Sequence, residues 1–276
     1  MQAARPLADG ITLLPLHTPT LPPATATNTL VIGRRRVVVI EPATPYPDER
    51  RKLDAVIDAR LAAGGELVAI LLTHHHADHV GYARDLAERT GAPVCAHPET
   101  AARLALPVDR TLADGEVIEL DEELTVTALF TPGHAPGHLV YLERRTGIAH
   151  AGDMVAGVGT ILIDPEDGGD MIAYLASLER LGACGASALV PAHGPVIDAP
   201  AACVRQYVDH RLARERRVLA ALDGGPRPFE DVLARAYGDT PPSLWPLAAR
   251  SLRAHLDKLE REGVVRSVEH KLERAD

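Results

Sequence analysis

Short apolar runs separated by turn residues dominate the first two hundred positions of the chain. Several of these runs are rich in Leu, Ile and Val and are bounded by proline or glycine, which is typical of buried strands. The predicted strands of a first block are 11–16, 29–32, 36–41, 67–72 and 93–96. A helical spacing of apolar residues predicts helices between them, over 48–63, about 80–89 and 98–104.

A second block repeats this alternation of strands and helices. Its predicted strands are 116–120, 124–130, 138–142, 147–151 and 187–191, and its predicted helix is about 169–181. Two sheets packed face to face, with helices on the outside, would explain why strands and helices occur in two blocks. The pattern therefore predicts an α/β fold.

Beyond Pro200 the apolar spacing is helical over most of the remaining chain. A long helix is predicted over 200–222, where Asp223-Gly-Gly-Pro interrupts it. Two shorter amphipathic helices and a strand over 264–268 follow, an order that resembles a winged-helix module. We therefore predict a main domain over 1–222, which includes the long helix, and a winged-helix-like domain over 223–276.

The composition narrows the functional classes. The 276-residue chain carries a formal net charge of −9, which argues against a broad phosphate-binding surface. Its three cysteines, Cys95, Cys184 and Cys203, are odd in number and widely spaced, so we predict free thiols. The N-terminus lacks an apolar segment of signal-peptide length, and no run reaches the roughly 18 apolar residues of a membrane span. We therefore predict a cytoplasmic protein without a membrane segment.

The strongest chemical signal follows one of the buried strands of the first block. Four histidines and an aspartate stand close together in the run His74-His75-His76-Ala-Asp78-His79. In an extended segment residues two apart project to the same side, so His74 and His76 can reach one metal ion while His75 points away. Asp78 and His79 follow at the turn into a helix and face a second position nearby. Imidazoles and a carboxylate at one strand end indicate a metal site.

A metal ion needs more ligands than this loop offers, and three later residues could supply them. His134, Asp153 and His193 each follow a predicted strand directly. Taken singly, each is more typical of an ordinary loop. Asp78 could also be a simple helix cap in a polar loop, but that interpretation does not account for the three later residues. Together these side chains indicate a site built at strand ends.

The order of these motifs resembles the metallo-β-lactamase fold of metallohydrolases over residues 11 to about 200. The resemblance implies a four-layer αββα sandwich with two divalent metal ions. The implied ligands of one ion are His74, His76 and His134, and those of the other are Asp78, His79 and His193. Asp153 would bridge the two ions. Zinc is the expected ion, and iron and manganese are alternatives.

The resemblance also implies a reaction. Two ions about 3.5–4 Å apart share a water and lower its pKa toward 7, so that a hydroxide attacks an ester, thioester, lactone or similar bond. Asp78 would both ligate a metal ion and orient or accept the proton, and we assign it the catalytic role. The expected partner is a small-molecule substrate, and a homodimer is an alternative to a monomer.

Two other functions stay open at this stage. From Thr131 to the winged-helix tail, the chain resembles the β-lactamase-like protein 2 group, whose animal members are endoribonucleases for single-stranded RNA. The alternative function is therefore RNA cleavage. A weaker alternative is a winged-helix DNA-binding module with a vestigial metal site, although the full set of ligands and the lack of a dense basic stripe argue against it.

Several further residues could either support a site or simply pack. His138 stands at a strand start, where we predict an edge residue, and His150 is predicted to be a core histidine. Tyr82 takes the place of a second glycine after the histidine loop, and we predict that it packs on the helix. The segment 157–160 lacks the lysine and the spacing of a phosphate-binding loop, so a flexible loop facing the substrate is predicted.

Overall fold

Two sheets form the centre of the large lobe in the computed structural model, which describes residues 4–121 and 123–275. The first sheet has the strand order β1-β2-β3-β4-β5-β6-β7 and the second the order β12-β11-β10-β9-β8. The strands of the first sheet are β1 (Arg5–Ala8), β2 (Ile11–His17), β3 (Ala26–Ile32), β4 (Arg36–Ile40), β5 (Glu66–Leu71), β6 (Val94–Ala96) and β7 (Arg110–Thr111). Those of the second are β8 (Val117–Glu119), β9 (Thr125–Phe130), β10 (Leu139–Glu143), β11 (Ile148–Gly152) and β12 (Ala188–Pro191).

Each sheet combines antiparallel and parallel pairs. In the first sheet β4 pairs in parallel with β5, and in the second β11 pairs in parallel with β12. The remaining pairs of the second sheet are antiparallel. Because parallel neighbours end at the same edge of a sheet, the loops that follow β5, β11 and β12 can meet at one end of the lobe.

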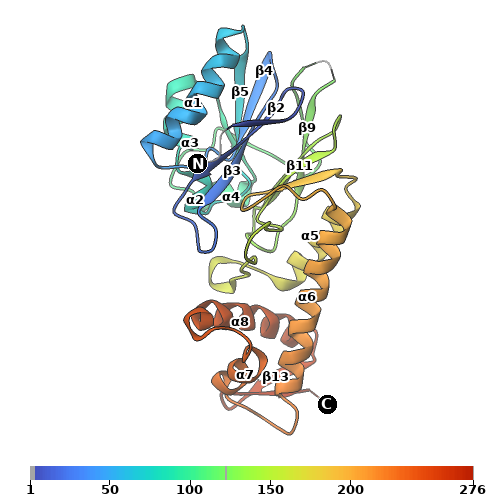
Figure 1. Ribbon diagram of the computed structural model, residues 1–276. Coiled ribbons are helices and arrows are strands. Elements are labelled where there is room, and N and C mark those ends of the chain that lie inside the picture. The colour runs from blue at the N-terminus through green and yellow to red at the C-terminus, as the bar shows by residue number, and fades with distance from the viewer. Residues whose placement is uncertain (1–3, 122, 276) are drawn as a thin grey trace.

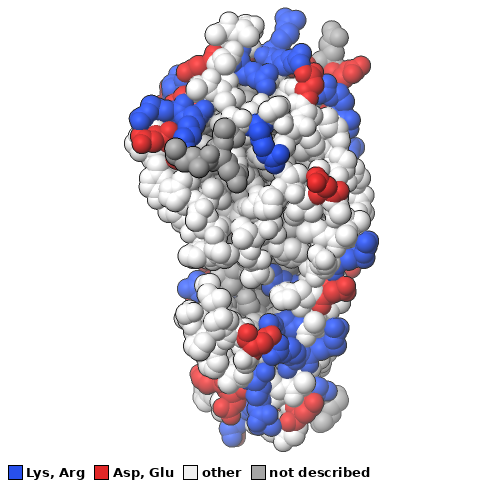
Figure 2. Space-filling model, viewed as in Figure 1, with Lys and Arg blue, Asp and Glu red and all other residues white. Residues whose placement is uncertain are grey.

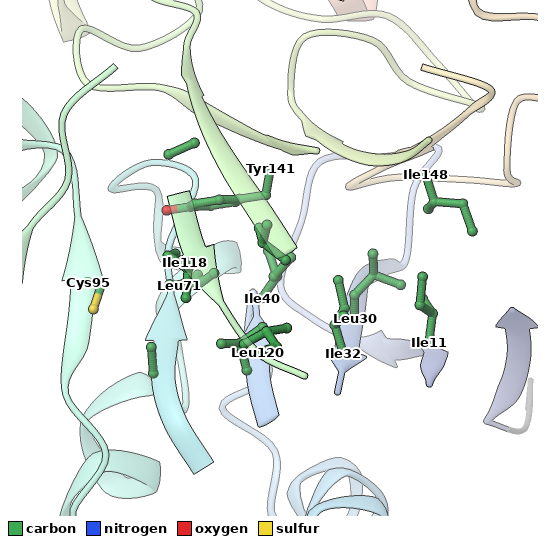
Figure 3. Close-up of a cluster of buried hydrophobic side chains, with 14 of the residues drawn as sticks. Ile11, Leu30, Ile32, Ile40, Leu71, Cys95, Ile118, Leu120, Tyr141 and Ile148 are labelled. Atoms are coloured by element: carbon green, nitrogen blue, oxygen red, sulfur yellow. The ribbon is translucent and has the colours of Figure 1, made fainter. Parts of the chain in front are cut away.

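The main apolar core lies between the two sheets. Figure 3 shows Ile40 and Leu71 of the first sheet beside Ile118 and Tyr141 of the second, and all four side chains are almost fully buried. After the exposed Arg36, strand β4 is apolar on both faces because its other face is covered as well.

Helices cover the outer faces of both sheets (Figure 1). α1 (Pro47–Ala62) and α3 (Ala83–Thr90) pack on the first sheet. α5 (Met171–Ala183) and α6 (Pro200–Ala221) pack on the second. The four layers confirm the predicted αββα sandwich.

The long helix α6 continues into a smaller lobe at the C-terminal end (Figure 1). This lobe contains α7 (Phe229–Ala236), α8 (Trp245–Arg261) and a hairpin of β13 (Val265–Val268) and β14 (Lys271–Arg274). Its separate apolar core joins α6, α7, α8 and the hairpin. The arrangement confirms the predicted winged-helix domain, and the boundary after residue 222 stays a prediction.

Several elements differ from their predicted form. The helix predicted over about 80–89 is two helices, α2 (Ala77–Val80) and α3, because the chain bends at Gly81 to pass within contact of the Ala43 carbonyl. Tyr82 at this bend is buried and its hydroxyl donates to Asp54, so it packs as predicted. The short elements β1, β7, β14, η1 (Pro165–Asp167) and η2 (Pro242–Leu244) were not predicted.

Within the part of the chain that the structure describes, no helix is long and apolar enough to span a membrane.

Candidate metal centre

Three histidines converge at the end of β5 and at the loop after β9. The Nε2 atom of His74 lies 2.9 Å from Nδ1 of His76. Nε2 of His134 lies 3.3 Å from the first of these nitrogens and 3.1 Å from the second. Nitrogens held about 2.0–2.1 Å from a tetrahedral zinc ion stand roughly 3.3 Å apart. The three ring nitrogens therefore have the spacing of ligands to one ion.

The outer nitrogens of these and neighbouring rings are engaged by the protein. Nδ1 of His134 donates to the carbonyl of Leu162 at 2.8 Å, and Nδ1 of His193 donates to that of Ala26 at 3.0 Å. A proton on the outer nitrogen leaves the inner Nε2 with a free lone pair. The tautomer that each carbonyl selects is the one that binds a metal ion.

A second group of donors lies beside the first. Nε2 of His193 is 3.5 Å from Oδ2 of Asp78, and Nε2 of His79 is 3.7 Å from Oδ1 of the same carboxylate. Nε2 of His79 and Oδ1 of Asp153 are both buried and have no hydrogen-bond partner among the described residues. Buried polar atoms are almost always satisfied, so this pair fits a site that a cation completes.

Asp153 stands between the two groups. Its Oδ2 lies 3.5 Å from Nε2 of His134 and 3.7 Å from Nε2 of His79, and its Oδ1 lies 3.5 Å from Nε2 of His193. The donor atoms divide into one group of His74, His76, His134 and Asp153 and another of Asp78, His79 and His193. All seven residues that the sequence singles out thus lie together, while His75 turns away toward Asp167.

Two glycines allow the later strand ends to approach the histidine loop. Gly133 has a φ of +128°, and a Cβ there would lie 2.2 Å from the backbone nitrogen of Tyr174 in α5. Gly152 has a φ of +50°, and a Cβ there would lie 2.4 Å from Nε2 of His138. Both positions therefore require a residue without a side chain, and each immediately precedes a residue of the site.

The electrostatics of the site favour the metal-binding forms of its residues. Burial lowers the pKa of His134 to about 4, and burial together with neighbouring imidazoles lowers the pKa of His74 well below its usual value. Burial opposes ionisation of Asp153, but His79, His193 and His134 outweigh it and lower the pKa of that carboxyl. Neutral imidazoles and an ionised carboxylate are the ligands that a divalent ion needs.

His79 is the exception among these imidazoles. Burial alone would lower its pKa, but the carboxylates of Glu41, Asp153 and Asp78 raise the pKa to about 10. The position between these three carboxylates therefore favours positive charge strongly. A metal ion at Nε2 of His79 would satisfy the same electrostatic demand.

Glu41 is a site residue that the sequence interpretation missed. It is fully buried just after β4, its Oε2 binds Nδ1 of His79, and its Oε1 accepts a hydrogen bond from the backbone nitrogen of Thr73 at 2.7 Å. A carboxylate behind a metal-ligating histidine fixes the orientation of the ring. The sequence did contain one signal for this residue, which is that a charged side chain directly follows a strand of β-branched residues.

Two other histidines lie beneath the site. His138 is fully buried, so the prediction of an edge residue is wrong: its Nε2 accepts from the backbone nitrogen of Asp153 at 3.1 Å. The pairing of β11 with β10 places that nitrogen over the start of β10. His150 is a buried core histidine as predicted, and its Nε2 donates to the carbonyl of Asn28 at 2.8 Å.

A pocket of about 980 Å³ opens from the site toward the smaller lobe. Its floor includes His76, Asp78, His134, Asp153 and His193. Its walls come from the segments 19–24 and 156–167, from α6 and from the region around η2 and α8. On the face shown in Figure 2, charged side chains gather toward the two ends of the molecule and the middle is largely uncharged. Pockets of this size bind small molecules.

Comparison with protein families divides the chain into two parts. Residues 22–193 match the metallo-beta-lactamase superfamily, and residues 229–274 match the beta-lactamase associated winged helix domain. The match of the first part includes every residue of the two donor groups.

Two individual relatives are similar to most of this chain. The chain is 33% identical over 262 residues to a beta-lactamase-like protein 2 homolog of Drosophila melanogaster, covering 87% of this chain and 84% of the relative. It is 34% identical over 203 residues to an atrochrysone carboxyl ACP thioesterase of Aspergillus chevalieri, covering 71% of this chain and 60% of the relative.

A similar solved structure is a metallo-beta-lactamase family protein from Thermus thermophilus, with a TM-score of 0.79 and 25% identity. The alignment covers 98% of this chain and 100% of that one. A beta-lactamase domain protein from Burkholderia ambifaria has a TM-score of 0.84 at 18% identity, covering 99% of this chain and 93% of that one. Both lobes are therefore part of the shared fold.

Proposed function

The chain belongs to the metallo-β-lactamase superfamily and is a hydrolase of that fold, and from this premise we propose that it cleaves an ester, thioester, lactone or similar acyl bond of a small molecule at a dinuclear metal centre. One observation carries the proposal. Two buried atoms that could bind a metal ion, Nε2 of His79 and Oδ1 of Asp153, have no hydrogen-bond partner, and each belongs to one of the two groups of candidate ligands. A relative named as an ACP thioesterase supports the acyl bond.

Seven residues would hold the ions. His74, His76 and His134 would bind one, Asp78, His79 and His193 the other, and Asp153 would bridge them. When bound, divalent ions supply an activated water at neutral pH and polarise the carbonyl oxygen of the substrate. The imidazole and carboxylate donors suit zinc, and iron and manganese are alternatives.

Asp78 is the residue to which we assign the proton transfer. It lies in the first turn of α2 and lines the pocket, and its side chain retains 19% exposure. Its carboxylate faces His79 and His193, which belong to the same group, and it can accept the proton that the attacking water loses. Asp153, the other carboxylate of the two donor groups, is more deeply buried, with 11% exposure of its side chain.

The charge of the pocket favours an acyl substrate over RNA. Three arginines line the pocket, and each is engaged within the protein. Arg211 donates to a backbone carbonyl, Arg214 pairs with Asp239 and Arg250 pairs with Asp164. Binding of single-stranded RNA relies on cations that are free to meet phosphates. We therefore place RNA cleavage second, as an outcome of the experiment below.

The third function, DNA binding by the winged helix, has less support. α8 precedes the hairpin, and it is the helix that such a domain would place in a DNA groove. Its Arg250 and Arg261 instead pair with Asp164 and Asp170 of the large lobe. Arg253 lies over the ring of Phe229 in its own lobe. α8 is thus occupied by contacts within the chain.

Metal analysis joined to activity tests the proposal. We expect the purified protein to bind close to two divalent ions, and His76→Ala and Asp153→Ala to reduce metal content and hydrolysis together. Asp78→Ala should lower kcat by at least about 10²-fold, because it removes a ligand and the proton acceptor. Glu99→Gln, an exposed surface change, is the control.

The substrate panel decides between the bond classes. The metal-loaded protein is incubated with thioesters, lactones and labelled single-stranded RNA. Turnover of acyl substrates that Asp78→Ala abolishes supports the proposal. RNA cleavage that Asp78→Ala abolishes, without acyl turnover, would replace it, and unchanged metal content and activity in all three variants would overturn it. The cytoplasmic location and the homodimer stay predictions from the sequence.

A further inference from the structure

Three exposed aliphatic side chains line the pocket. Among the described residues, the large apolar side chains with the greatest exposure include Leu21 at 58%, Leu244 at 45% and Val158 at 38%. All three line the pocket. They come from three separate segments: the loop after β2, the loop after β11, and η2 of the smaller lobe.

This arrangement is unlike an ordinary scatter of surface leucines. Single exposed apolar residues need no explanation, but several from distant segments that line one pocket indicate an interaction site. The candidate ligands line the same pocket, so an apolar group held by these side chains would bring an attached polar bond near the ligand atoms.

We propose that Leu21, Val158 and Leu244 form an acyl-binding subsite, so that the substrate carries an aliphatic chain next to the bond that is cleaved. This inference rests on the proposed function and names its substrate class. It also gives the winged-helix lobe a role, because Leu244 makes that lobe one wall of the subsite. Each added methylene of the chain should gain contact with the subsite until it is filled.

A chain-length series tests the subsite. Hydrolysis of N-acetylcysteamine thioesters from acetyl to decanoyl should show kcat/KM rising about two- to fourfold per methylene in the natural protein. In Leu21→Ser and Leu244→Ser the ratio of decanoyl to acetyl kcat/KM should fall about five- to tenfold. Val268→Ser should keep the natural ratio, since Val268 is 42% exposed on β13 of the same lobe as Leu244 and does not line the pocket.

A binding series separates this inference from the proposed reaction. Calorimetry with S-alkyl N-acetylcysteamine thioethers, which cannot be hydrolysed, measures affinity against chain length directly. Rising affinity without hydrolysis of any ester, thioester or lactone would support the subsite and overturn the reaction. Hydrolysis or binding that is indifferent to chain length would overturn the subsite.

A second, independent observation concerns the outer side of His76. Its Nδ1 faces the other ligand atoms, and its Nε2 lies 2.6 Å from Oδ2 of Asp167. The other oxygen of this carboxylate lies 3.3 Å from Nε2 of His75. Asp167 ends the short helix η1, more than ninety residues from the histidine loop in the sequence.

The segment that carries Asp167 is tied to α8 of the smaller lobe. Oδ1 of Asp164 caps η1 by accepting from the backbone nitrogen of Glu166, and Oδ2 of the same side chain pairs with Arg250 at 2.9 Å. Asp170, which caps α5 on the other side of η1, pairs with Arg261. Two ion pairs from one helix thus hold both ends of the segment.

We infer that Asp167 is a positioning residue for His76, and that α8 keeps Asp167 in place. A carboxylate on the outer nitrogen of a ligating histidine fixes its tautomer and ring orientation, and its loss costs about 10- to 100-fold in metal affinity. This inference also rests on the proposed metal centre.

Metal affinity, measured by chelator competition, tests the role of Asp167. Asp167→Ala should weaken metal binding about 10- to 100-fold, and Asp167→Asn should restore part of it, because the amide oxygen still accepts a hydrogen bond. Cobalt substitution should give an altered visible spectrum in Asp167→Ala. Glu179→Gln, an exposed change on the neighbouring helix α5 that does not line the pocket, is the control. Unfolding of the metal-free variants shows whether the fold is intact.

The contribution of α8 is tested separately. Arg250→Ala combined with Arg261→Ala should weaken metal binding in the same direction as Asp167→Ala, by about two- to tenfold. Arg253→Ala, on the same helix, should not. Natural metal affinity in Asp167→Ala would overturn the positioning role, and natural affinity in the double arginine variant would overturn the part played by α8.

Discussion

At the scale of single residues, candidate ligands are held from behind by groups that set their orientation. Glu41 does this for His79, a backbone carbonyl does it for His134, and Asp167 does it for His76. The candidate ligands could be predicted from the sequence because they are imidazoles and carboxylates at strand ends. The partners of these ligands could not be predicted. Glu41 and Asp167 show no motif in the sequence, and only the folded chain brings them next to the histidines.

The carboxylate of Glu41 yields the first prediction. Glu41→Gln keeps the shape of the side chain but removes the charge behind His79, so metal affinity should fall about 10- to 100-fold. Chelator competition measures this fall. Glu66→Gln, at the exposed start of β5 in the same sheet, should keep natural affinity, and equal affinities of the two variants would contradict the role of Glu41.

Gly152 yields the second prediction. Gly152→Ala places a Cβ against Nε2 of His138, whereas Gly185→Ala also has a positive φ but no atom within 4 Å. Both variants carry the strain of a left-handed backbone, but only the first also has a steric clash. Urea unfolding should therefore show Gly152→Ala to be about 1–3 kcal/mol less stable than Gly185→Ala. Equal losses would mean that β10 shifts freely to accept the methyl group.

At the scale of elements, the long periodic segments were predicted and the short ones were not. Strands such as β4 and β9 and helices such as α1 and α6 contain enough apolar positions to reveal their period. β7 has two residues and η1 has three, so neither has a period, and their conformation depends on contacts with β6 and α8. The structure of the segment 156–167 is therefore the part that could be predicted least well from the sequence.

The packing of α8 on α6 yields a prediction of pH dependence. Glu215 of α6 pairs with Lys258 of α8 at 2.9 Å. Burial would raise the pKa of Glu215, but the neighbouring side chains of His255 and Lys258 outweigh it and lower the pKa. A lowered pKa means that the ion pair stabilises the fold above the unfolded-state pKa of about 4.3, and that this contribution is lost as pH falls below it.

Glu215→Gln should therefore lower the free energy of unfolding by about 1 kcal/mol at pH 7, with a smaller difference from the natural protein at pH 4. Thermal or urea unfolding of the metal-free proteins measures this difference without interference from protonated ligands. Glu99→Gln removes an exposed pair and serves as the control. A difference that grows toward pH 4 would contradict the sign.

At the scale of the whole molecule, the proposed metal centre lies between the two sheets. His74, His76, Asp78 and His79 follow a strand of the first sheet, whereas His134, Asp153 and His193 follow strands of the second. Ions bound between them stabilise only the folded state, by about 4 kcal/mol for an ion present at a thousand times its Kd.

Removal of metal by a chelator should therefore lower the Tm of the protein, and zinc should restore it. Calorimetry of the chelated, reloaded and untreated protein measures both steps. Asp153→Ala should show a smaller response to the chelator, because it has lost the residue between the two groups. A Tm that is indifferent to the chelator would contradict a metal centre that joins the sheets.

The spread of these ligands along the chain has a consequence for biosynthesis. His193 leaves the ribosome 119 residues after His74 (193 − 74), so the centre is complete only when both sheets have emerged. Leu244 follows another 51 residues later (244 − 193), which at about 5–20 residues per second takes roughly 3–10 s. A nascent chain thus passes through an interval in which its candidate metal ligands are all present while the lobe that walls the pocket does not yet exist.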